Sequence, residues 1–344
     1  MTDLTQEPTP EIKAELTQTL MRLGLVWRGR EVRYTALTGG VSSDIWLVET
    51  GGRKFCVKRA LAQLKVEADW QAPVERNGYE VAWMRAAANF TPAAVPKVLE
   101  HDPDSGLFVM DYMDPAKFAL WKTELRDGRA DLFMAARVGA VIAAIHAGTA
   151  DDPEVAKAFA SDEIFHAIRL EPYLEAAARA HPDLADALMG LVEVTANTKR
   201  VLVHGDVSPK NILIGRDGPV LLDAECAWFG DPAFDPAFCL NHLLLKCLWA
   251  PAASGLFLEC FRELADAYLD GVWWEPIADI EARIARLLPG LLLARVDGKS
   301  PAEYVTEVAD KALVRRIAGQ FLTDPVTRLS EVAEAWRTGL EERA

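Results

Sequence analysis

One short β-type segment, set between long helical patterns, constrains the fold more than any other part of the chain. It begins with the apolar run at residues 201–203. Two further apolar runs, residues 212–214 and 220–222, flank a glycine-bounded turn at residues 215–218. Two apolar runs around a short polar turn with glycine are typical of a β-hairpin. We therefore expect a strand followed by a hairpin inside an otherwise helical part of the chain.

The predicted hairpin brings three oxygen-bearing side chains together. Asn211 stands just before its first strand and Asp223 just after its second, so both lie at the same end. The loop that contains Asp206 joins this end to the preceding strand. Phosphoryl transfer needs such a set, because one carboxylate orients and deprotonates an attacking hydroxyl while other oxygens bind Mg²⁺ on the nucleotide phosphates.

The rest of the chain divides into two parts of different character. Residues 1–113 combine one helical pattern with several strand-like runs, two of which flank Gly51 and Gly52. Residues 114–344 are mostly helical apart from the β segment. A chain of 344 residues is long enough for two lobes. We predict an α+β fold with a small, β-rich N-terminal lobe (1–113) and a larger, mainly helical C-terminal lobe (114–344).

Charge and cysteine content exclude some partners and compartments. The formal net charge of -14 opposes attraction to nucleic acid or to an anionic membrane surface. The strongest apolar run, residues 238–249, is too short to span a bilayer and predicts a buried helix. Five cysteines without CxxC spacing suit reduced core thiols, and the polar, acidic N-terminus is unlike a signal peptide. We expect a cytoplasmic protein without nucleic-acid or membrane partners.

The segment around Asp206 carries a resemblance to a known superfamily. Residues 204–211 (HGDVSPKN), followed twelve residues later by Asp223, resemble the catalytic and metal-binding signature of the aminoglycoside phosphotransferase and choline kinase superfamily, whose fold is like that of protein kinases. The resemblance implies that Asp206 is the catalytic base and that Asn211 and Asp223 bind Mg²⁺. It also implies that His204 ties the catalytic loop to the metal-binding turn.

Residues after Asp223 are similar to the methylthioribose kinase branch of this superfamily. Asp223 is followed by Glu225 and then by the GDPAFD motif of residues 230–235. In that branch a second acidic residue, two positions after the first, helps to hold metal, which makes Glu225 a candidate ligand; the alternative is an exposed acid on the loop. The resemblance also implies that Asp235 supports the catalytic loop through backbone hydrogen bonds.

The nucleotide half of the site is expected in the N-terminal lobe. Gly39, Gly40, Ser42 and Ser43 belong to a turn between two strand-like runs whose N–H groups suit phosphate binding, although a Gly-Gly hairpin without ligand is as frequent. About fifteen residues later Lys58 ends an apolar alternation, as the phosphate-binding lysine of the kinase fold does. We predict that these residues contact ATP.

Two further positions complete the expected nucleotide site. The lysine of a kinase fold pairs with a glutamate on the following helix, and Glu80 fits better than its rival Glu75 because it precedes a helical apolar face. Residues 107–113 look like the hinge of the superfamily, in which backbone groups around Asp111 and Met113 meet the adenine edge. Met113 is also compatible with a plain core position.

The sequence gives a weaker signal for the residues that bind the phosphoryl acceptor. Arg315 and Arg316 resemble the arginine pair that contacts the sugar in methylthioribose kinases; the alternative is a solvated pair on a helix. Cations here oppose an aminoglycoside acceptor, which is a polycation. The glycine loop departs from the methylthioribose kinase form. We expect a small hydroxylated acceptor, a sugar or methylthioribose-like compound, that is neutral or anionic.

Other functions stay open on the sequence alone. An aminoglycoside or choline kinase belongs to the same superfamily. A protein kinase is disfavoured, because HGD replaces the usual HRD and no DFG or APE motif frames an activation loop. A non-catalytic, nucleotide-binding regulatory protein would not need the base Asp206. The resemblance also allows a homodimer.

Overall fold

The computed structural model describes residues 8–37, 43–60 and 76–343, and the chain divides into two compact units. The N-terminal unit comprises residues 1–88 and 96–114. The C-terminal unit comprises residues 89–95 and 115–344. The segment 89–95 therefore packs with the helical part of the chain, although it precedes the last strands of the N-terminal unit.

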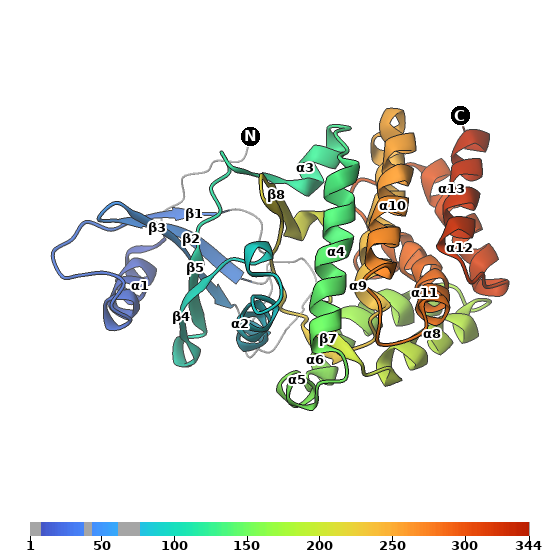
Figure 1. Cartoon of the computed structure of the whole chain (residues 1–344). Helices are drawn as coiled ribbons and strands as arrows, with labels where there is room; N and C mark the ends of the chain where they lie inside the picture. Colours follow the sequence, from blue (N-terminus) through green and yellow to red (C-terminus); the bar gives the residue numbers. More distant parts are fainter. Residues whose placement is uncertain (1–7, 38–42, 61–75, 344) are drawn as a thin grey trace. The chain divides into compact units, whose positions relative to one another are not determined.

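The N-terminal unit is built on one antiparallel sheet of five strands in the order β1-β2-β3-β5-β4 (Figure 1). Helices α1 and α2 accompany it. The elements are α1 (Pro10–Arg22), β1 (Arg33–Ala36), β2 (Ser43–Thr50), β3 (Arg53–Ala60), α2 (Arg76–Ala87), β4 (Val98–Asp102), the short η2 (Pro103–Ser105) and β5 (Leu107–Asp111).

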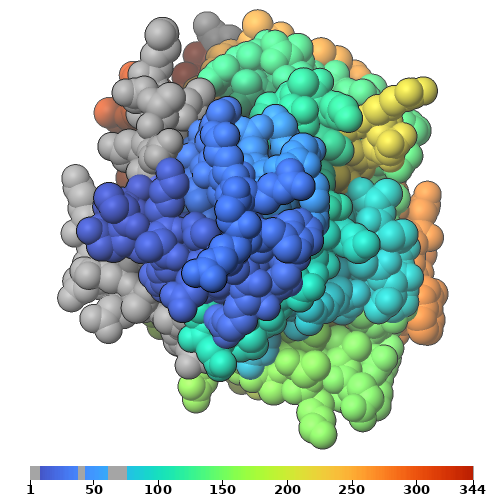
Figure 2. Space-filling model, turned by 90° about the vertical axis from the view of Figure 1, so that its left-hand side faces the viewer, coloured from blue at the N-terminus to red at the C-terminus, as the bar shows by residue number. Residues whose placement is uncertain are grey.

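Local signals explain the first elements of this unit. The predicted hairpin of β2 and β3 is confirmed: Thr50 pairs with Arg53, and both turn residues, Gly51 and Gly52, have positive φ, which glycine adopts at little cost. Helix α1 begins after Thr9, whose side chain accepts a hydrogen bond from the helix N-terminus. Its Leu16 packs into the core of the sheet. Figure 2 shows this end of the chain, in blue, as one continuous surface.

The C-terminal unit is mainly helical. Its helices are α3 (Trp121–Arg126), α4 (Leu132–Thr149), α5 (Pro153–Ala158), α6 (Asp162–Phe165), the π-helix η3 (His166–Glu175), α7 (Ala176–Ala180), α8 (Ala185–Asn197), α9 (Phe234–Trp249), α10 (Ser254–Leu269), α11 (Ile277–Asp297), α12 (Val308–Thr323) and α13 (Leu329–Arg343). Short 3₁₀ turns are η1 (Pro92–Ala94), η4 (Pro209–Asn211) and η5 (Pro251–Ala253). The strands are β6 (Phe118–Leu120), β7 (Val201–Val203), β8 (Ile212–Gly215), β9 (Gly218–Leu221) and β10 (Trp228–Gly230).

Helices α4 and α10 run side by side in the C-terminal unit (Figure 1). Their close approach depends on Gly139, because a Cβ atom there would overlap the carbonyl oxygen of Leu264 in α10. Among the described residues, α4 alone is long and apolar enough, by length and composition, to cross a membrane. Its packing against α10 accounts for that apolar composition.

The β segment forms as the sequence predicts. Strands β8 and β9 pair as an antiparallel hairpin with Ile212 opposite Leu221, and β7 precedes them. Three details were not predicted. Strand β6 adds a third strand beside β8, where the sequence suggested only helix; β10 pairs with β7; and the helical run 162–180 contains the π-helix η3.

Candidate active site

The loop after β7 holds Asp206 beside the end of the β8–β9 hairpin. Asn211 Nδ2 donates to the Asp206 carbonyl oxygen at 3.1 Å, and the Leu222 N–H donates to the Asn211 carbonyl oxygen at 2.9 Å. These two hydrogen bonds join the loop, the start of β8 and the residue before Asp223. Residues 206, 211 and 222 thus lie together, as the hairpin predicts, and a shared catalytic and metal site of Asp206, Asn211 and Asp223 stays a prediction.

His204 fixes the loop from inside. Its Nδ1 accepts a hydrogen bond from the Asp206 N–H at 3.1 Å, so Nε2 carries the proton and donates to the Leu222 carbonyl oxygen at 3.1 Å. Burial lowers the pKa of His204, which keeps the ring neutral and preserves this tautomer. His204 thus links the Asp206 loop to the turn before Asp223, as predicted, and the catalytic and metal-binding roles of these segments stay predictions.

Asp235 supports the same loop from helix α9. Its two carboxylate oxygens accept hydrogen bonds from the N–H groups of His204 (2.7 Å) and Gly205 (2.8 Å), as predicted. His146 of α4, 1% exposed, lies 3.2 Å from Asp235 Oδ2 and also bonds the hydroxyl of Tyr268. Asp235 is buried, and these bonds satisfy its charge inside the protein.

Gly205 is required by the backbone at this point. Its φ is +79°, a left-handed conformation, and a Cβ atom would lie 2.7 Å from the carbonyl oxygen of Cys226. A residue with a side chain would therefore be strained and would overlap Cys226 at the position between His204 and Asp206, so glycine is required there.

The Asp206 carboxylate, 4% exposed, is held asymmetrically. Oδ2 lies 2.9 Å from Arg169 Nη2 and 3.2 Å from Lys210 Nζ. Oδ1 has the hydroxyl of Ser208 at 3.4 Å, a weak contact. Arg169 comes from the π-helix η3, is 8% exposed and also donates from Nε to the Gly205 carbonyl oxygen. One carboxylate oxygen is thus fixed by cations, and the other makes only the weak contact with Ser208.

The candidate metal ligands fit Mg²⁺. Because the Nδ2 group of Asn211 is engaged by Asp206, its side-chain oxygen is the atom left for a hard cation. Asp223 has φ of +67°, one of two positive values at non-glycine residues in the described chain, and such strain gathers at functional sites. Glu225 is half-buried two residues later. Two carboxylates and an amide oxygen suit Mg²⁺ that is also bound by nucleotide phosphates.

In the N-terminal unit, Lys58 of β3 pairs with Glu80 of α2. Lys58 Nζ lies 2.8 and 2.7 Å from the two carboxylate oxygens, and both side chains are 3% exposed. The predicted partner of Lys58 is confirmed; the rival Glu75 lies outside the described residues. The pair joins the sheet to a helix and presents a charged lysine from rigid elements.

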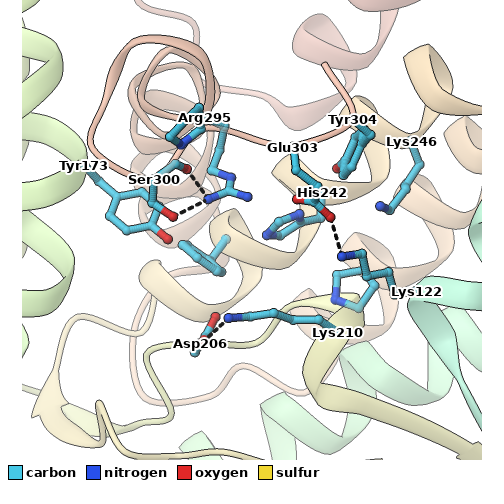
Figure 3. A pocket seen from close by; sticks show the side chains of 13 residues that line it. Lys122, Tyr173, Asp206, Lys210, His242, Lys246, Arg295, Ser300, Glu303 and Tyr304 are labelled. Carbon is cyan, nitrogen blue, oxygen red and sulfur yellow. Dashed lines mark hydrogen bonds and ion pairs between the residues drawn. The ribbon is translucent and has the colours of Figure 1, made fainter. Parts of the chain in front are cut away.

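A cavity of about 170 Å³ lies in the C-terminal unit and has Asp206 in its wall (Figure 3). Four cationic side chains line it, with aromatic residues between them and a second carboxylate, Glu303. The cations are Lys122, Lys210, Lys246 and Arg295, and the aromatic residues include Tyr173, Phe238 and Tyr304. The cavity is therefore rich in positive charge next to a carboxylate that suits a base.

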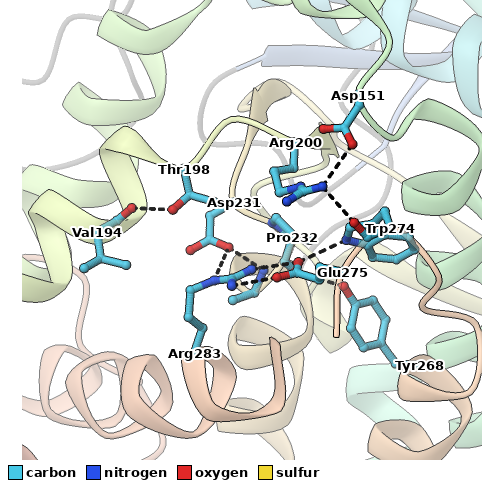
Figure 4. A network of polar contacts seen from close by, with 11 residues as sticks. Asp151, Val194, Thr198, Arg200, Asp231, Pro232, Tyr268, Trp274, Glu275 and Arg283 are labelled. Atoms are coloured by element: carbon cyan, nitrogen blue, oxygen red, sulfur yellow. Dashed lines mark hydrogen bonds and ion pairs between the residues drawn. The ribbon is translucent and has the colours of Figure 1, made fainter. Parts of the chain in front are cut away.

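A second polar network fixes the start of helix α9 (Figure 4). Asp231 Oδ1 accepts a hydrogen bond from the Ala233 N–H at 3.0 Å and lies 3.2 Å from Arg283 Nε of α11. Arg283 also makes two hydrogen bonds to Glu275, at 2.7 and 2.8 Å. Burial raises the pKa of Asp231, which the arginine opposes. This network anchors the helix that carries Asp235.

Comparison with known proteins assigns the family. Residues 33–270 match the phosphotransferase enzyme family, APH. The chain belongs to this family. Among APH relatives of known activity, methylthioribose kinase from Pectobacterium carotovorum subsp. carotovorum (strain PC1) is 26% identical over 229 residues, 59% of this chain and 57% of that protein. The chain thus matches less than three fifths of that relative's length.

Solved structures show the fold of this APH family member. A choline/ethanolamine kinase family protein from Mesorhizobium loti has 16% sequence identity and a TM-score of 0.52, covering 95% of this chain and 99% of that one. Amicoumacin kinase hAmiN, in complex with AMP-PNP, Ca²⁺ and Ami, has 14% identity and a TM-score of 0.54, covering 94% and 98%. The predicted α+β, kinase-like fold is confirmed.

Other predicted site residues lie as follows in this APH chain. Gly39, Gly40 and Ser42 are outside the described residues, whereas Ser43 begins β2 and is buried. Asp111 ends β5, and its N–H donates to the Lys97 carbonyl oxygen at 3.0 Å. Met113 follows the strand, half-buried. Contact of these residues with a nucleotide stays a prediction.

The two predicted acceptor arginines are engaged elsewhere. Arg315 lies 2.6 Å from Asp297, Arg316 lies 3.0 Å from Glu342, and neither lines the cavity at Asp206. Their contact with an acceptor stays a prediction that the geometry does not favour.

Sequence reasoning missed Arg169 and Lys246. Arg169 carried one signal, because its helical neighbours Phe165 and Tyr173 are aromatic, so a charge there needs a buried partner.

Proposed function

We propose that this protein is a kinase that uses ATP and Mg²⁺ to phosphorylate the hydroxyl group of a small molecule. The observation that carries the proposal is that the Asp206 carboxylate faces a cavity, while the Asp206 carbonyl oxygen accepts a hydrogen bond from the candidate metal ligand Asn211, whose own carbonyl oxygen accepts one from the Leu222 N–H before Asp223. Family membership supports phosphoryl transfer, and a base beside metal ligands is what that reaction needs.

The residues have separate roles in the proposed reaction. Asp206 accepts the proton of the acceptor hydroxyl while the oxygen forms its bond to the γ-phosphorus and the bond from that phosphorus to ADP breaks. Lys58, held by Glu80, contacts the phosphates. Asp111 and Met113 are proposed to meet the adenine through their backbone. Gly39, Gly40, Ser42 and Ser43 are proposed to cover the phosphates.

Asn211, Asp223 and Glu225 would hold the metal. Mg²⁺ neutralises charge on the phosphates and orients them for transfer. The donor set is all oxygen, which suits a hard cation. The complex of amicoumacin kinase with AMP-PNP and Ca²⁺ supports a nucleotide with a divalent metal in this fold.

The first acceptor class to test is a sugar or a methylthioribose-like compound. The support is the resemblance to methylthioribose kinases, one of which shares 26% identity with this chain over 229 residues. We further propose that the enzyme works in the cytoplasm, because its five cysteines are buried and free.

Two substitutions test the proposed function. Asp206→Asn keeps the shape of the side chain but removes the base, so kcat should fall by about 10²- to 10⁴-fold while ATP affinity changes little. Asp223→Asn should abolish turnover at ordinary Mg²⁺, because it removes an anionic ligand. Turnover is measured with Mg-ATP and a panel of sugars and amino alcohols, and ATP affinity by calorimetry.

Clear outcomes separate the proposal from its rivals. Wild-type turnover in Asp206→Asn would exclude this base. ATP binding without turnover for any acceptor, in the wild type as in both variants, would favour a nucleotide-binding regulatory protein. Thermal unfolding of each variant shows whether a loss of activity reflects a loss of fold.

A further inference from the structure

The charges that line the cavity at Asp206 do not balance. Lys122 forms an ion pair with Glu303, and Lys210 forms one with Asp206. The two other cations, Lys246 and Arg295, have no carboxylate within ion-pair distance in the described part of the chain. Buried cations in folded proteins are almost always paired, so this pair of side chains needs another explanation.

The burial of the Lys246 side chain is energetically unfavourable. The residue is 1% exposed, and its Nζ lies 4.0 Å from the ring centre of Trp249 and 3.7 Å from that of Tyr304. Two aromatic faces favour a cation but do not replace a carboxylate or water. Burial, together with the charge of Lys122, lowers the pKa of Lys246 to about 6. Folding alone gives no reason to place a lysine here.

Arg295 and Tyr304 also have unused donors. Arg295, 8% exposed, donates from Nη1 to the carbonyl oxygen of Ser300 and, at 2.9 Å, to its hydroxyl, but its Nε has no partner. The hydroxyl of Tyr304 is buried and also has no partner. An unsatisfied buried donor costs about 1 to 3 kcal/mol, so two beside one cavity indicate a ligand that binds them.

The donors gather on one side of the cavity. Figure 3 shows Arg295, Tyr304 and Lys246 in the upper part of the view, with Asp206 and Lys210 below them. His242 lies between and stays neutral, because burial and the neighbouring cations keep its pKa well below the usual value. The cavity therefore has an end with a base and an end with unpaired donors.

Resting on the proposed function, we propose that the acceptor is a small anionic alcohol, whose carboxylate or phosphate binds Lys246, Arg295 and Tyr304 while its hydroxyl meets Asp206. Guanidinium and ammonium groups are the usual partners of both anions. The volume of about 170 Å³ suits a compact hydroxy acid, since a cavity of about 150 Å³ holds benzene. The phosphoryl group goes to the hydroxyl, and the anionic group takes no part in the bond changes.

A series of probes on one carbon skeleton tests the charge. Glycerol is neutral, D-glycerate carries a carboxylate and glycerol 3-phosphate carries a phosphate. Methylthioribose serves as a larger neutral compound. Each is titrated by calorimetry into the full chain saturated with Mg-AMP-PNP, so that the anions do not bind at the nucleotide site. At least one anion should bind about tenfold or more tightly than glycerol, and the two anions distinguish the carboxylate from the phosphate.

Substitutions locate the binding. Lys246→Met and Arg295→Met should each weaken binding of the preferred anion by about 10- to 100-fold, the usual loss for one charged hydrogen bond, and leave glycerol and AMP-PNP unaffected. Lys299→Met is the matched control, because Lys299 is an exposed cation near the cavity that pairs with Glu171 at 2.6 Å. Thermal unfolding shows that each variant is folded.

Three results would overturn the inference: anions that bind no better than glycerol, tighter binding of methylthioribose than of either anion, or equal weakening by Lys299→Met. Different results are expected if the proposed kinase function is wrong. In that case Mg-AMP-PNP does not bind, or no acceptor is phosphorylated, whatever the charge preference of the cavity. If a neutral acceptor is phosphorylated with dependence on Asp206 and no anion binds more tightly than glycerol, the kinase function stands and the anion site is excluded.

Discussion

At the scale of single residues, Arg169 holds the carboxylate of Asp206, the proposed base. It lies 2.9 Å from Asp206 Oδ2 and also donates to the Gly205 carbonyl oxygen, so one side chain fixes both the carboxylate and the loop that carries it. Tyr173 and Phe238 pack beside it, with the guanidinium 5.8 and 5.7 Å from their ring centres. Arg169 is a positioning residue, since it acts through Asp206.

Substitution of Arg169 should therefore act on kcat. Arg169→Met removes the cation and both hydrogen bonds, and we expect kcat to fall by about tenfold or more while KM for ATP stays within about twofold. Arg169→Lys should restore part of the activity, because one amine can pair with Asp206 but cannot also donate to Gly205 in the same geometry. A role in folding alone would instead lower the melting temperature without this separation of kcat from KM and without rescue by lysine.

The sequence predicted Asp206, Asn211 and Asp223 as neighbours because a short hairpin fixes their positions locally. It predicted the Lys58–Glu80 pair because the resembling kinase fold pairs its lysine with a glutamate on the following helix, and Glu80 precedes a helical apolar face. Arg169 contacts Asp206 and Lys246 lines the cavity, and these two residues stand 37 and 40 positions away from Asp206 in the chain. Such contacts depend on tertiary packing, which no local pattern specifies.

At the scale of elements, helices α4 and α10 support the loop that carries Asp206. Helix α4 carries His146, which bonds Asp235, and α10 carries Tyr268, whose hydroxyl meets His146 at 3.0 Å. The spacing of these helices depends on Gly139. The sequence predicted α4 from its apolar pattern, but the role of Gly139 appears only when its neighbour Leu264 is known. Likewise, η3 has the composition of an ordinary helix, so its π geometry could not be predicted.

Gly139→Ala should destabilise the protein. The added methyl group would overlap the Leu264 carbonyl oxygen and push the two helices apart, at a cost of about 1 to 3 kcal/mol in the free energy of unfolding. Urea denaturation measures it. Gly190→Ala is the matched control, because Gly190 lies in α8 with open space around its Cβ position, and alanine there should stabilise by about 0.5 to 1 kcal/mol. Equal effects at both sites would contradict the close approach of α4 and α10.

At the scale of the whole molecule, an acidic protein contains a cationic cavity. The net charge is -14, yet four cations and two carboxylates line the space at Asp206. Composition predicted the absence of nucleic-acid partners from the sum of the charges. The net charge does not reveal a local excess of positive charge. For this reason the composition could not indicate the proposed anion site.

The buried lysine should make stability depend on pH. An exposed lysine has a pKa of 10.5, whereas burial, with help from Lys122 and Arg295 and against Glu303, lowers the pKa of Lys246 in the folded protein to about 6. Between these values the unfolded chain binds more protons than the folded one, so the contribution of Lys246 to the free energy of unfolding rises with pH. Compared with Lys246→Met, the wild type should be less stable near pH 6, and the difference should narrow as the pH rises towards about 10.

Urea denaturation of both proteins at several pH values measures this difference, and other titrating groups cancel because they are common to both. A difference that is constant with pH would show that Lys246 keeps an ordinary pKa in the folded protein, and one that grows as the pH rises would show a raised pKa; either result would contradict this prediction.

The same burial gives Lys246 a chemical character that exposed lysines lack. With a pKa of about 6 in the cavity without a ligand, its side chain is a free amine at neutral pH unless a bound anion holds it in the charged form, and a free amine is a nucleophile. An exposed lysine is protonated under these conditions and has no lone pair to offer. An anionic aldehyde or activated ester would be attracted by Arg295 and Lys122. The aldehyde would condense with the Lys246 amine to an imine with loss of water, and the ester would acylate the amine with loss of its alcohol. The residues that we propose bind an anionic alcohol would therefore also direct selective acylation or imine formation to Lys246.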